Sequence, residues 1–470
     1  MSLIQDNSEE CSTAPFELFQ VSPTQTAVEK SYDVEYHPVA PIRDGAPIEY
    51  HIPASTDEYM DLNNSRMYMR CRILNADGTD IDLEEVAAPV NDMLNSVFSN
   101  AELYMNDELI SHSNNLHGHA SILAHLMHDS VESAQSERSM QLIYKDTPGQ
   151  MNVVEARLPN PNELIPGHDM KVSRSAVDNM LGFELYNANE LLGNQGLHQR
   201  YLKTRGSQPV ELLGKLRIDM FEQERCLPSG VGLKLRFYRQ KDAFVLMSPR
   251  PLGLYKVRIE EAFLLIRRVR PAPGVKLGHA DTLKKMSAKF PITRKECKSM
   301  ALPRGLRSWK QDNIFLGQLP KRVVVAMVDS EAMSGSYAEN PYNFQHFNVS
   351  YMQLYCDGEP VHTRPLKPSV AADNYIHCYE TLYRGLNRMD GERSCIIKRP
   401  DWSRGYSLFA FDLTADMDAD DHYSLIKHGN LRLEIEFAAA LPQTIDLLFL
   451  AEFDNVIEIT EDRHVQRDYV

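Results

Sequence analysis

The chain has 470 residues, of which 43% are apolar and 24% charged, a composition typical of folded globular proteins and unlike that of disordered ones. Its length exceeds what one hydrophobic core usually supports, so two domains are expected. No segment approaches the roughly 18 apolar residues of a membrane helix, which predicts no membrane span. The seven cysteines include no CxxC pair, which argues against a disulfide framework and a zinc ribbon.

Residues 1–30 are mostly polar, acidic and without periodicity, which predicts a flexible N-terminal arm. Three apolar residues interrupt this pattern and could anchor the arm, namely Phe16, Leu18 and Phe19.

Strands are predicted wherever apolar and polar side chains alternate with a period of two, because such a sheet has one buried and one solvated face. The first clear example covers residues 67–73, and the pattern returns at 216–220, 233–237 and 431–437. Residues 323–328 are apolar throughout, which predicts a strand buried on both faces.

Few helices are expected. Apolar side chains at helical spacing predict one helix over about 119–130 and another over about 375–385, with Gly385 at its end. A third, short helix is predicted between Asp420 and Gly429. The two apolar stripes are interpreted as core packing and not as binding sites.

Three landmarks occur twice in the same order, which indicates one β-rich unit used twice. The first is an alternating strand that ends in a tight turn, Asn-Asp or Asp-Gly, and is followed by a helix. The matched pairs are 103–109 with 354–360, 232–237 with 429–435, and 255–259 with 446–450. The first half carries many more residues between equivalent landmarks, and a long Pro-, Asn-, Gly- and Ser-rich loop at 133–210 accounts for them.

Antiparallel strands with long crossovers predict an all-β fold: two tandem eight-stranded jelly rolls, a double jelly roll, with a few short helices in the loops. The expected division is a flexible arm (1–30), a first jelly roll (31–272) with a long loop insertion at about 133–210, a basic linker (273–298), and a second jelly roll (299–470).

Positive charge is concentrated between Arg267 and Lys310, although the whole chain carries −15. Thirteen basic residues lie there against Asp281 and Glu296 alone. Such a stretch fits either a solvated linker or a surface that meets an acidic partner.

Candidate metal and catalytic motifs are weak. His117 and His119 have the HxH spacing of cupin enzymes, but no glutamate follows at the required distance. His125 and His128 are predicted to be surface or interface histidines, since zinc needs three or four ligands. The acidic run 416–421 begins like a calcium loop, but its sixth and twelfth positions do not fit. P-loop, HExxH and GxSxG motifs are absent, so no catalytic, cofactor or metal residue is predicted and the chain is not expected to be an enzyme.

Two segments resemble the double-jelly-roll major capsid proteins of Maverick/Polinton elements and adintovirus-like viruses. They are Phe315–Met327 with the following Asn340–Asn348, and Ala451–Ile459 with the closing Arg467–Tyr469. The resemblance is most specific over residues 310–470 and looser over 50–270. It implies upright jelly rolls, three chains in a pseudo-hexagonal capsomer, and no catalytic residues.

The sequence therefore predicts a major capsid protein, a homotrimeric pseudo-hexameric capsomer that tiles an icosahedral shell around double-stranded DNA. Its expected partners are its own copies, neighbouring capsomers, penton and minor capsid proteins, and packaged DNA, contacted non-specifically through Arg267–Lys310. It is expected in the virion capsid after synthesis in the host cytoplasm, with the nucleus as an alternative place of assembly. The main alternative is a tandem β-sandwich that binds a carbohydrate or another ligand, and a cupin-type enzyme comes third.

Overall fold

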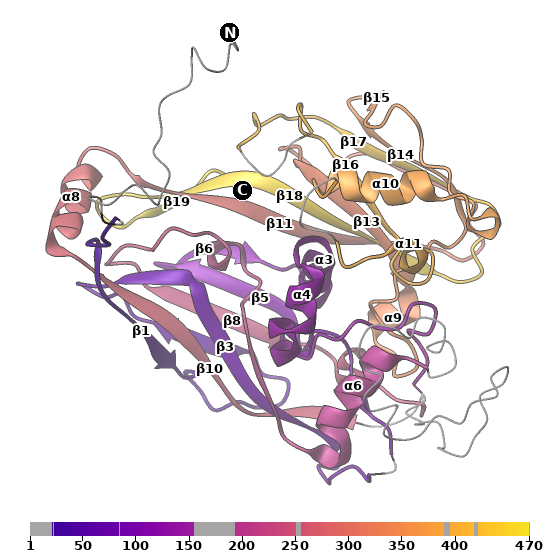
Figure 1. Ribbon diagram of the computed structural model, residues 1–470, viewed down its shortest axis with the longest axis horizontal. Coiled ribbons are helices and arrows are strands. Elements are labelled where there is room, and N and C mark those ends of the chain that lie inside the picture. The colour runs from indigo at the N-terminus through magenta and orange to yellow at the C-terminus, as the bar shows by residue number, and fades with distance from the viewer. Residues whose placement is uncertain are drawn as a thin grey trace.

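The computed structural model describes residues 21, 23–83, 85–154, 193–250, 255–389, 395–417 and 422–469. Strands dominate it, and they form two similar units that lie side by side, the first indigo to pink and the second orange to yellow in Figure 1. Each unit packs two antiparallel sheets around an apolar core.

The first unit has one sheet in the order β1-β10-β3-β7 and another in the order β2-β8-β5-β6. Its strands are β1 (Val28–Tyr36), β2 (Ile48–Ile52), β3 (Tyr59–Asn75), β5 (Phe98–Met105), β6 (Glu108–His112), β7 (Val210–Gly214), β8 (Leu233–Arg239) and β10 (Tyr255–Pro271). A short ribbon of β4 (Ala88–Pro89) and β9 (Leu246–Met247) lies beside them.

The second unit repeats this arrangement strand for strand. Its sheets have the orders β11-β18-β13-β16 and β12-β17-β14-β15, with β19 paired to β18. The strands are β11 (Ala288–Leu302), β12 (Ser308–Gln311), β13 (Arg322–Asp329), β14 (Val349–Cys356), β15 (Glu359–Pro360), β16 (Leu408–Asp412), β17 (Leu431–Phe437), β18 (Ile445–Ile459) and β19 (Val465–Arg467). Counted along either unit, the eight main strands pair as 1-8-3-6 and 2-7-4-5, which is the jelly-roll order. The predicted double jelly roll is thus confirmed.

The repeated landmarks fall on equivalent strands. Each alternating strand before a tight turn is the fourth of its unit, β5 or β14, and the other two pairs fall on β8 with β17 and on β10 with β18. At both turns the two central residues have positive φ, Asn106 and Asp107 in one and Asp357 and Gly358 in the other. Turns of this kind match the twist of the strands that they join, which is why the Asn-Asp and Asp-Gly signals predicted them.

The predicted sheet faces are confirmed. In β3 the side chains of Met67, Met69, Cys71 and Ile73 are buried, and the residues between them are partly exposed. Strand β13 is buried along Arg322–Val328, as expected for an apolar run with both faces covered.

Helices lie in the connections and number more than expected. The α-helices are α2 (Met93–Ser96), α3 (His117–His128), α4 (Val131–Gln135), α6 (Gln195–Thr204), α7 (Asp242–Val245), α8 (Pro273–Leu283), α9 (Ser330–Ser334), α10 (Ile376–Gly385) and α11 (Arg399–Trp402). The 3-10 helices are η2 (Glu137–Gln141), η4 (Arg205–Ser207), η5 (Asp219–Phe221) and η6 (Val370–Ala372). Helices α3 and α10 are the two that the apolar stripes predicted.

Three local predictions differ from the structure. Residues 216–220 form no strand: 216–218 are irregular, and 219 and 220 belong to η5. No helix forms over 422–429, the described part of the third predicted helix. The stretch 273–298 is no simple linker: 273–283 form α8, and 288–298 belong to β11, an integral strand of the second unit.

The connections divide the molecule into two ends. Val28 pairs with Pro271 and Ala288 with Ile459, so the start of β1, α8 and the C-terminal β19 share one end, which we call the linker end. Asn75 pairs with Tyr255 and Asp329 with Ile445, so the β3–β5 and β13–β14 connections lie at the other end, the loop end. Figure 1 shows α8 far from α6 and α9 accordingly.

The middle of the predicted insertion at 133–210, residues 155–192, lies outside the described residues, as does most of the arm. The insertion is described on both sides, from α4 to residue 154 and from α6 to β7. The chain enters β7 from the loop end, where Val210 pairs with Cys71.

Candidate assembly interface

At the linker end, the loop between β7 and β8 (residues 215–232) binds the first strand of the second unit. Asp219 accepts a hydrogen bond from the backbone N–H of Lys295, at 3.3 Å, and Glu222 forms an ion pair with the Lys295 ammonium group. The Arg225 guanidinium donates to the carbonyl oxygen of Lys289, at 2.7 Å. These contacts fix β11 to the first unit along much of its length.

The carboxylates of this contact have opposite pKa shifts. Burial acts to raise the pKa of Glu222, but the charges of Lys295 and Arg217 outweigh it and lower that pKa to about 2. Burial raises the pKa of Asp219 to about 7, because Lys295 compensates it only in part. Glu222 is therefore the charged partner that holds Lys295, whereas Asp219 is an acceptor in a poorly solvated position.

Helix α3 makes a second contact between the units. The imidazole Nε2 of His128 lies 2.9 Å from Oε1 of Glu452 on β18, and the Arg322 guanidinium of β13 lies 2.9 Å from Oε2 of the same carboxylate. Burial opposes the charge of Glu452, yet Arg322 and His128 hold its pKa well below the usual range. His128 thus lies where the two units of one chain meet, which agrees with the surface-or-interface prediction only within the chain.

The matching prediction for His125 is wrong. This histidine is buried, and its Nδ1 lies 2.6 Å from Oδ2 of Asp129, which also forms ion pairs with Arg138 and Arg217. The helix stripe of Ile122 and Leu126 suggested that the opposite face is solvated, but the chain after α3 folds over that face.

At the loop end, Asp146 joins three parts of the chain. One carboxylate oxygen accepts from the Arg200 guanidinium of α6 at 2.7 Å, and the other accepts from the amide of Asn340, in the second unit, at 3.0 Å. Both Asp146 and Arg200 are almost completely buried. The flanks of the insertion are thereby tied to the second jelly roll.

The HxH motif is engaged in packing. His117 contacts Ser113 Oγ through Nδ1 and Asn95 Oδ1 through Nε2, and His119 contacts the carbonyl oxygen of Pro341. Burial lowers the pKa of both rings to about 4, which keeps them uncharged near neutral pH. Within the described ranges, no group of three or more His, Cys, Asp or Glu side chains could hold a metal ion.

Two hollows in the described surface are small or polar. One of about 320 Å³ lies over β2 and β8 and is lined by His51, Asn106 and Lys234 among others. Another of about 270 Å³ lies between the units and is lined by the charged groups of the linker-end contact, including Glu222, Lys295 and Glu452. Ligand pockets usually enclose about 300–1,000 Å³. The second hollow is smaller than this and charged, and the first only reaches the lower end of the range, so neither by itself favours the ligand-binding alternative.

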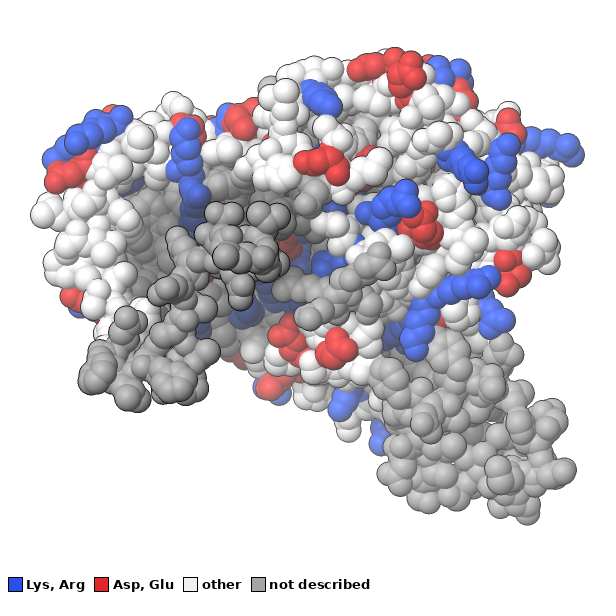
Figure 2. Space-filling view, turned by 45° about the horizontal axis from the view of Figure 1, so that its top comes forward, with Lys and Arg blue, Asp and Glu red and all other residues white. Residues whose placement is uncertain are grey.

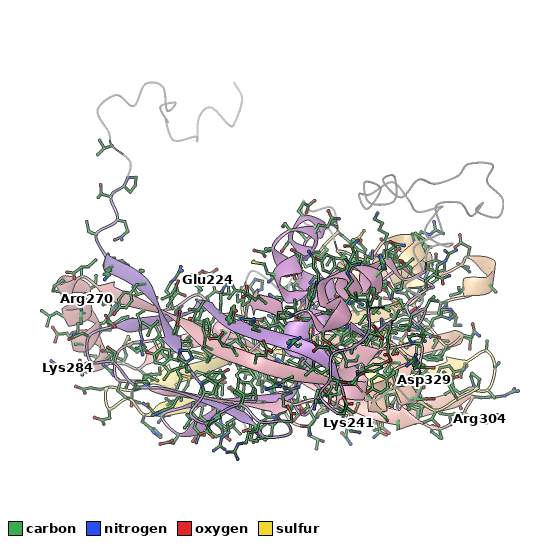
Figure 3. All side chains as sticks on the ribbon, turned by 90° about the horizontal axis from the view of Figure 1, so that it is seen from below. Glu224, Lys241, Arg270, Lys284, Arg304 and Asp329 are labelled. Carbon is green, nitrogen blue, oxygen red and sulfur yellow. The ribbon has the colours of Figure 1, made fainter. Side chains whose placement is uncertain are left out.

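The basic stretch is neither one surface nor unbalanced in space. Figure 3 shows Arg270 and Lys284 at the opposite end of the molecule from Arg304. Acidic side chains from elsewhere in the chain pair with many of its cations: Asp33 with Arg267, Glu58 with Arg270, Asp57 with Lys276, Glu458 with Lys289, Glu222 with Lys295, and Glu434 with Lys310. On the face shown in Figure 2, Lys and Arg side chains accordingly lie beside Asp and Glu in small groups.

Apart from His128, the residues that join the units were not singled out in the sequence as contacts between them. A signal was present for Glu452, because it interrupts the apolar strand 445–453, where a charged side chain needs a partner. No comparable signal marks Asp146, Asp219 or Glu222, which lie in polar connections. Among the helices that the structure describes, none is long and apolar enough to cross a membrane.

No protein-family model matches the chain. In sequence it is similar to the uncharacterized protein F54H12.2 of Caenorhabditis elegans, with 18% identity over 449 residues, which cover 93% of this chain and 96% of that protein.

In structure the chain is similar to viral capsid proteins. A chain of the Sputnik virophage structure matches with a TM-score of 0.63 and 10% identity, over 98% of this chain and 93% of that one. The Faustovirus major capsid protein gives 0.57 at 7% identity, over 93% and 92%. The mavirus major capsid protein gives 0.54 at 11% identity, over 98% and 95%. At such identities the likeness shows a shared double-jelly-roll fold over nearly the whole length of each chain.

Proposed function

We propose that the chain is a major capsid protein. The observation that carries this is the fold at full length: two jelly rolls of identical strand order, matched over almost all of the virophage and mavirus chains. Two of the structural neighbours are named as major capsid proteins, which supports the same role for this chain.

The proposed assembly is a homotrimer. Two units of equal topology per chain, taken three times about one axis, give a block with nearly six-fold shape that can fill a lattice. Interfaces of this obligate kind commonly bury more than about 2,000 Å². Light scattering on the purified protein is expected to give three times the 53.6 kDa of the chain, and a mass that stays near 53.6 kDa at micromolar concentration contradicts the proposal.

These trimers are proposed to tile an icosahedral shell around double-stranded DNA, together with penton and minor capsid proteins. The protein would then reside in the virion after synthesis in the host cytoplasm, with assembly there or in the nucleus. A relative in a nematode supports an element of the Maverick/Polinton kind, carried by an animal. Electron microscopy of the expressed protein should show trimeric blocks or shells, and separate single-chain particles would speak for the ligand-binding alternative.

The loop end is proposed to face outward and the linker end inward. The first jelly roll carries its predicted insertion, 133–210, at the loop end, and that segment would form the crown of the trimer and a clasp between subunits. Shortening 133–210 to the length of the second-half connection should weaken the trimer and change its exposed surface. An unchanged trimer with an unchanged protease pattern contradicts this orientation.

Contact with DNA is proposed for the linker-end part of the basic stretch only, since the rest of it lies along β11 and at the loop end. Replacing Lys284, Lys285 and Lys289 by Glu should leave trimers intact and reduce DNA retention in assembled particles, most strongly at low salt, because the contact is ionic and non-specific. If particles of this variant retain DNA normally across a salt series, the stretch has only a structural role.

A further inference from the structure

We infer that residues 422–430, which lead into β17, bind strand β1 of a neighbouring copy of this chain; they belong to the connection between β16 and β17, called the β16–β17 loop below. The inference rests on the proposed trimer and names the residues that would hold it together.

The contact inside the chain supplies the template. In the first unit the β7–β8 loop binds β11, the edge strand with which the second unit begins. Rotating the first unit onto the second about a pseudo-six-fold axis places the second unit on the first unit of the next copy. The same operation turns the β7–β8 loop into the β16–β17 loop and turns β11 into β1.

Both halves of this equivalent contact are open in the single chain. Strand β11 has several buried residues, whereas seven of the nine residues of β1 are exposed and the other two are only partly buried. The exposed side chains of β1 include Val28 and Tyr32. In the β16–β17 loop, Leu425 is 85% exposed and Ile426 45% exposed, whereas the neighbouring Tyr423 lines the hollow between the two units of its own chain. Large apolar side chains gathered on one loop indicate a surface that is covered in the assembly.

A second contact of the chain has the same relation. The C-terminal tail follows β18 and binds β6 of the first unit, where the Tyr469 hydroxyl donates to the carbonyl oxygen of Ile110 at 2.8 Å. In the first unit the segment that follows the last strand is α8, which has no buried residue, and Leu277 on it is exposed. The counterpart of β6 is β15, whose two residues are both exposed. Helix α8 of one copy would therefore lie against β15 of the next.

The two open surfaces also lie where a ring requires them. Figure 1 shows β1 at the lower edge of the molecule and β15 and β17 at its upper edge. Head-to-tail contacts between different surfaces close into a ring when the rotation allows it, whereas a two-fold dimer would use one surface twice.

The outer face of the β2-β8-β5-β6 sheet offers a matched control. On β2 and β8 its charged side chains pair among themselves, as Glu49 does with Lys234 and Arg236, and of this sheet only β6, at the far edge, takes part in the contacts between the units described above. The same rotation therefore leaves this face outside the trimer. Val39 is an exposed apolar residue beside it, at the edge of the shallow hollow over β2 and β8.

The first experiment compares Leu425→Asp/Ile426→Asp with Val39→Asp by light scattering over a dilution series. The loop variant is expected to raise the concentration at which trimers dissociate by at least about tenfold, because each contact loses two apolar side chains. The Val39→Asp trimer should dissociate like the wild type. Unfolding curves of the three proteins confirm that each is folded.

The second experiment maps the contact directly. A photo-reactive benzophenone amino acid in place of Leu425 should cross-link, in trimers mixed from isotopically light and heavy chains, to the tryptic peptide Ser31–Arg43 of another copy. Cross-links to other peptides, or a loop variant that dissociates like the wild type, overturn the inference while the trimer stands. A wild-type protein that is monomeric contradicts the proposed function itself.

Discussion

Replacing Asp146 with asparagine is expected to destabilise both jelly rolls together. The Asp146 carboxylate is 1% exposed, and it neutralises Arg200, which is 0% exposed and reaches it from α6 at 2.7 Å. Its other oxygen accepts from Asn340 in the second unit. An asparagine at 146 has the same shape but carries no charge and has only one acceptor oxygen, so it cannot satisfy both donors.

The expected loss in unfolding free energy depends on the hydrogen bonds that Arg200 keeps after the substitution. Removing one partner of a buried ion pair typically costs about 3–5 kcal/mol, because the other charge stays buried. Arg200 also donates to the carbonyl oxygens of Pro89 and Tyr144, each at 2.8 Å, and these bonds survive the substitution. The loss in unfolding free energy should therefore lie near the lower value, about 3 kcal/mol.

The two tryptophans make the assay specific. Both Trp309 and Trp402 belong to the second unit, so fluorescence follows that unit and far-ultraviolet circular dichroism follows the whole chain. In urea both transitions should move together to lower concentration, at one fixed protein concentration. The control is Asp281→Asn, which removes an exposed ion pair with Lys284 and should change nothing measurable. A cost below about 1 kcal/mol, or a shift in one signal alone, would show that Asp146 does not join the units.

Two further substitutions test the buried contacts. Asp219→Asn should stabilise the protein above pH 7 by as much as about 4 kcal/mol. The pKa of Asp219 is about 7 in the folded protein and 3.8 ordinarily, so wild-type stability falls as pH rises between these values. In urea titrations the gain in stability should vanish below about pH 4. Gly118→Ala in α3 should lower the free energy of unfolding by about 1–3 kcal/mol, as measured by thermal or urea unfolding. Alanine favours helices, but its Cβ would lie 2.7 Å from the Tyr342 hydroxyl oxygen. Adding Tyr342→Phe should recover part of the lost stability, and no recovery would refute the clash.

The sequence predicts the strands of this fold well where one face of a sheet is buried. Alternation along Met67–Ile73 marks an inward and an outward face that any pairing partner must respect. The Asn-Asp and Asp-Gly turns identify equivalent strands in the two units, since each needs residues that tolerate positive φ. Local signals of this kind suffice for strand order once a jelly roll is assumed.

Contacts between distant segments could not be predicted in the same way. The run from Arg267 to Lys310 is basic in sequence, but the acids that balance it, such as Asp33, Glu222 and Glu458, come from other parts of the chain. His125 likewise looks solvated on a helical wheel, although residues after α3 bury it. Charge in a linear segment is therefore weak evidence for a charged surface when the fold packs its strands against segments of opposite sign.

The two equivalent loops differ in chemistry in a way that fits their two kinds of partner. The β7–β8 loop meets β11 of its own chain, and it does so with desolvated carboxylates, Asp219 and Glu222. Such a contact tolerates the cost of burying charge because its partner is held nearby by the same polypeptide. The β16–β17 loop presents Leu425 and Ile426 instead. Apolar side chains can bind a separately folded copy without the cost of desolvating charges. An apolar patch of only a few residues is also small enough to keep free subunits from aggregating. One strand order would thus support both the observed contact within the chain and the proposed assembly contact between chains.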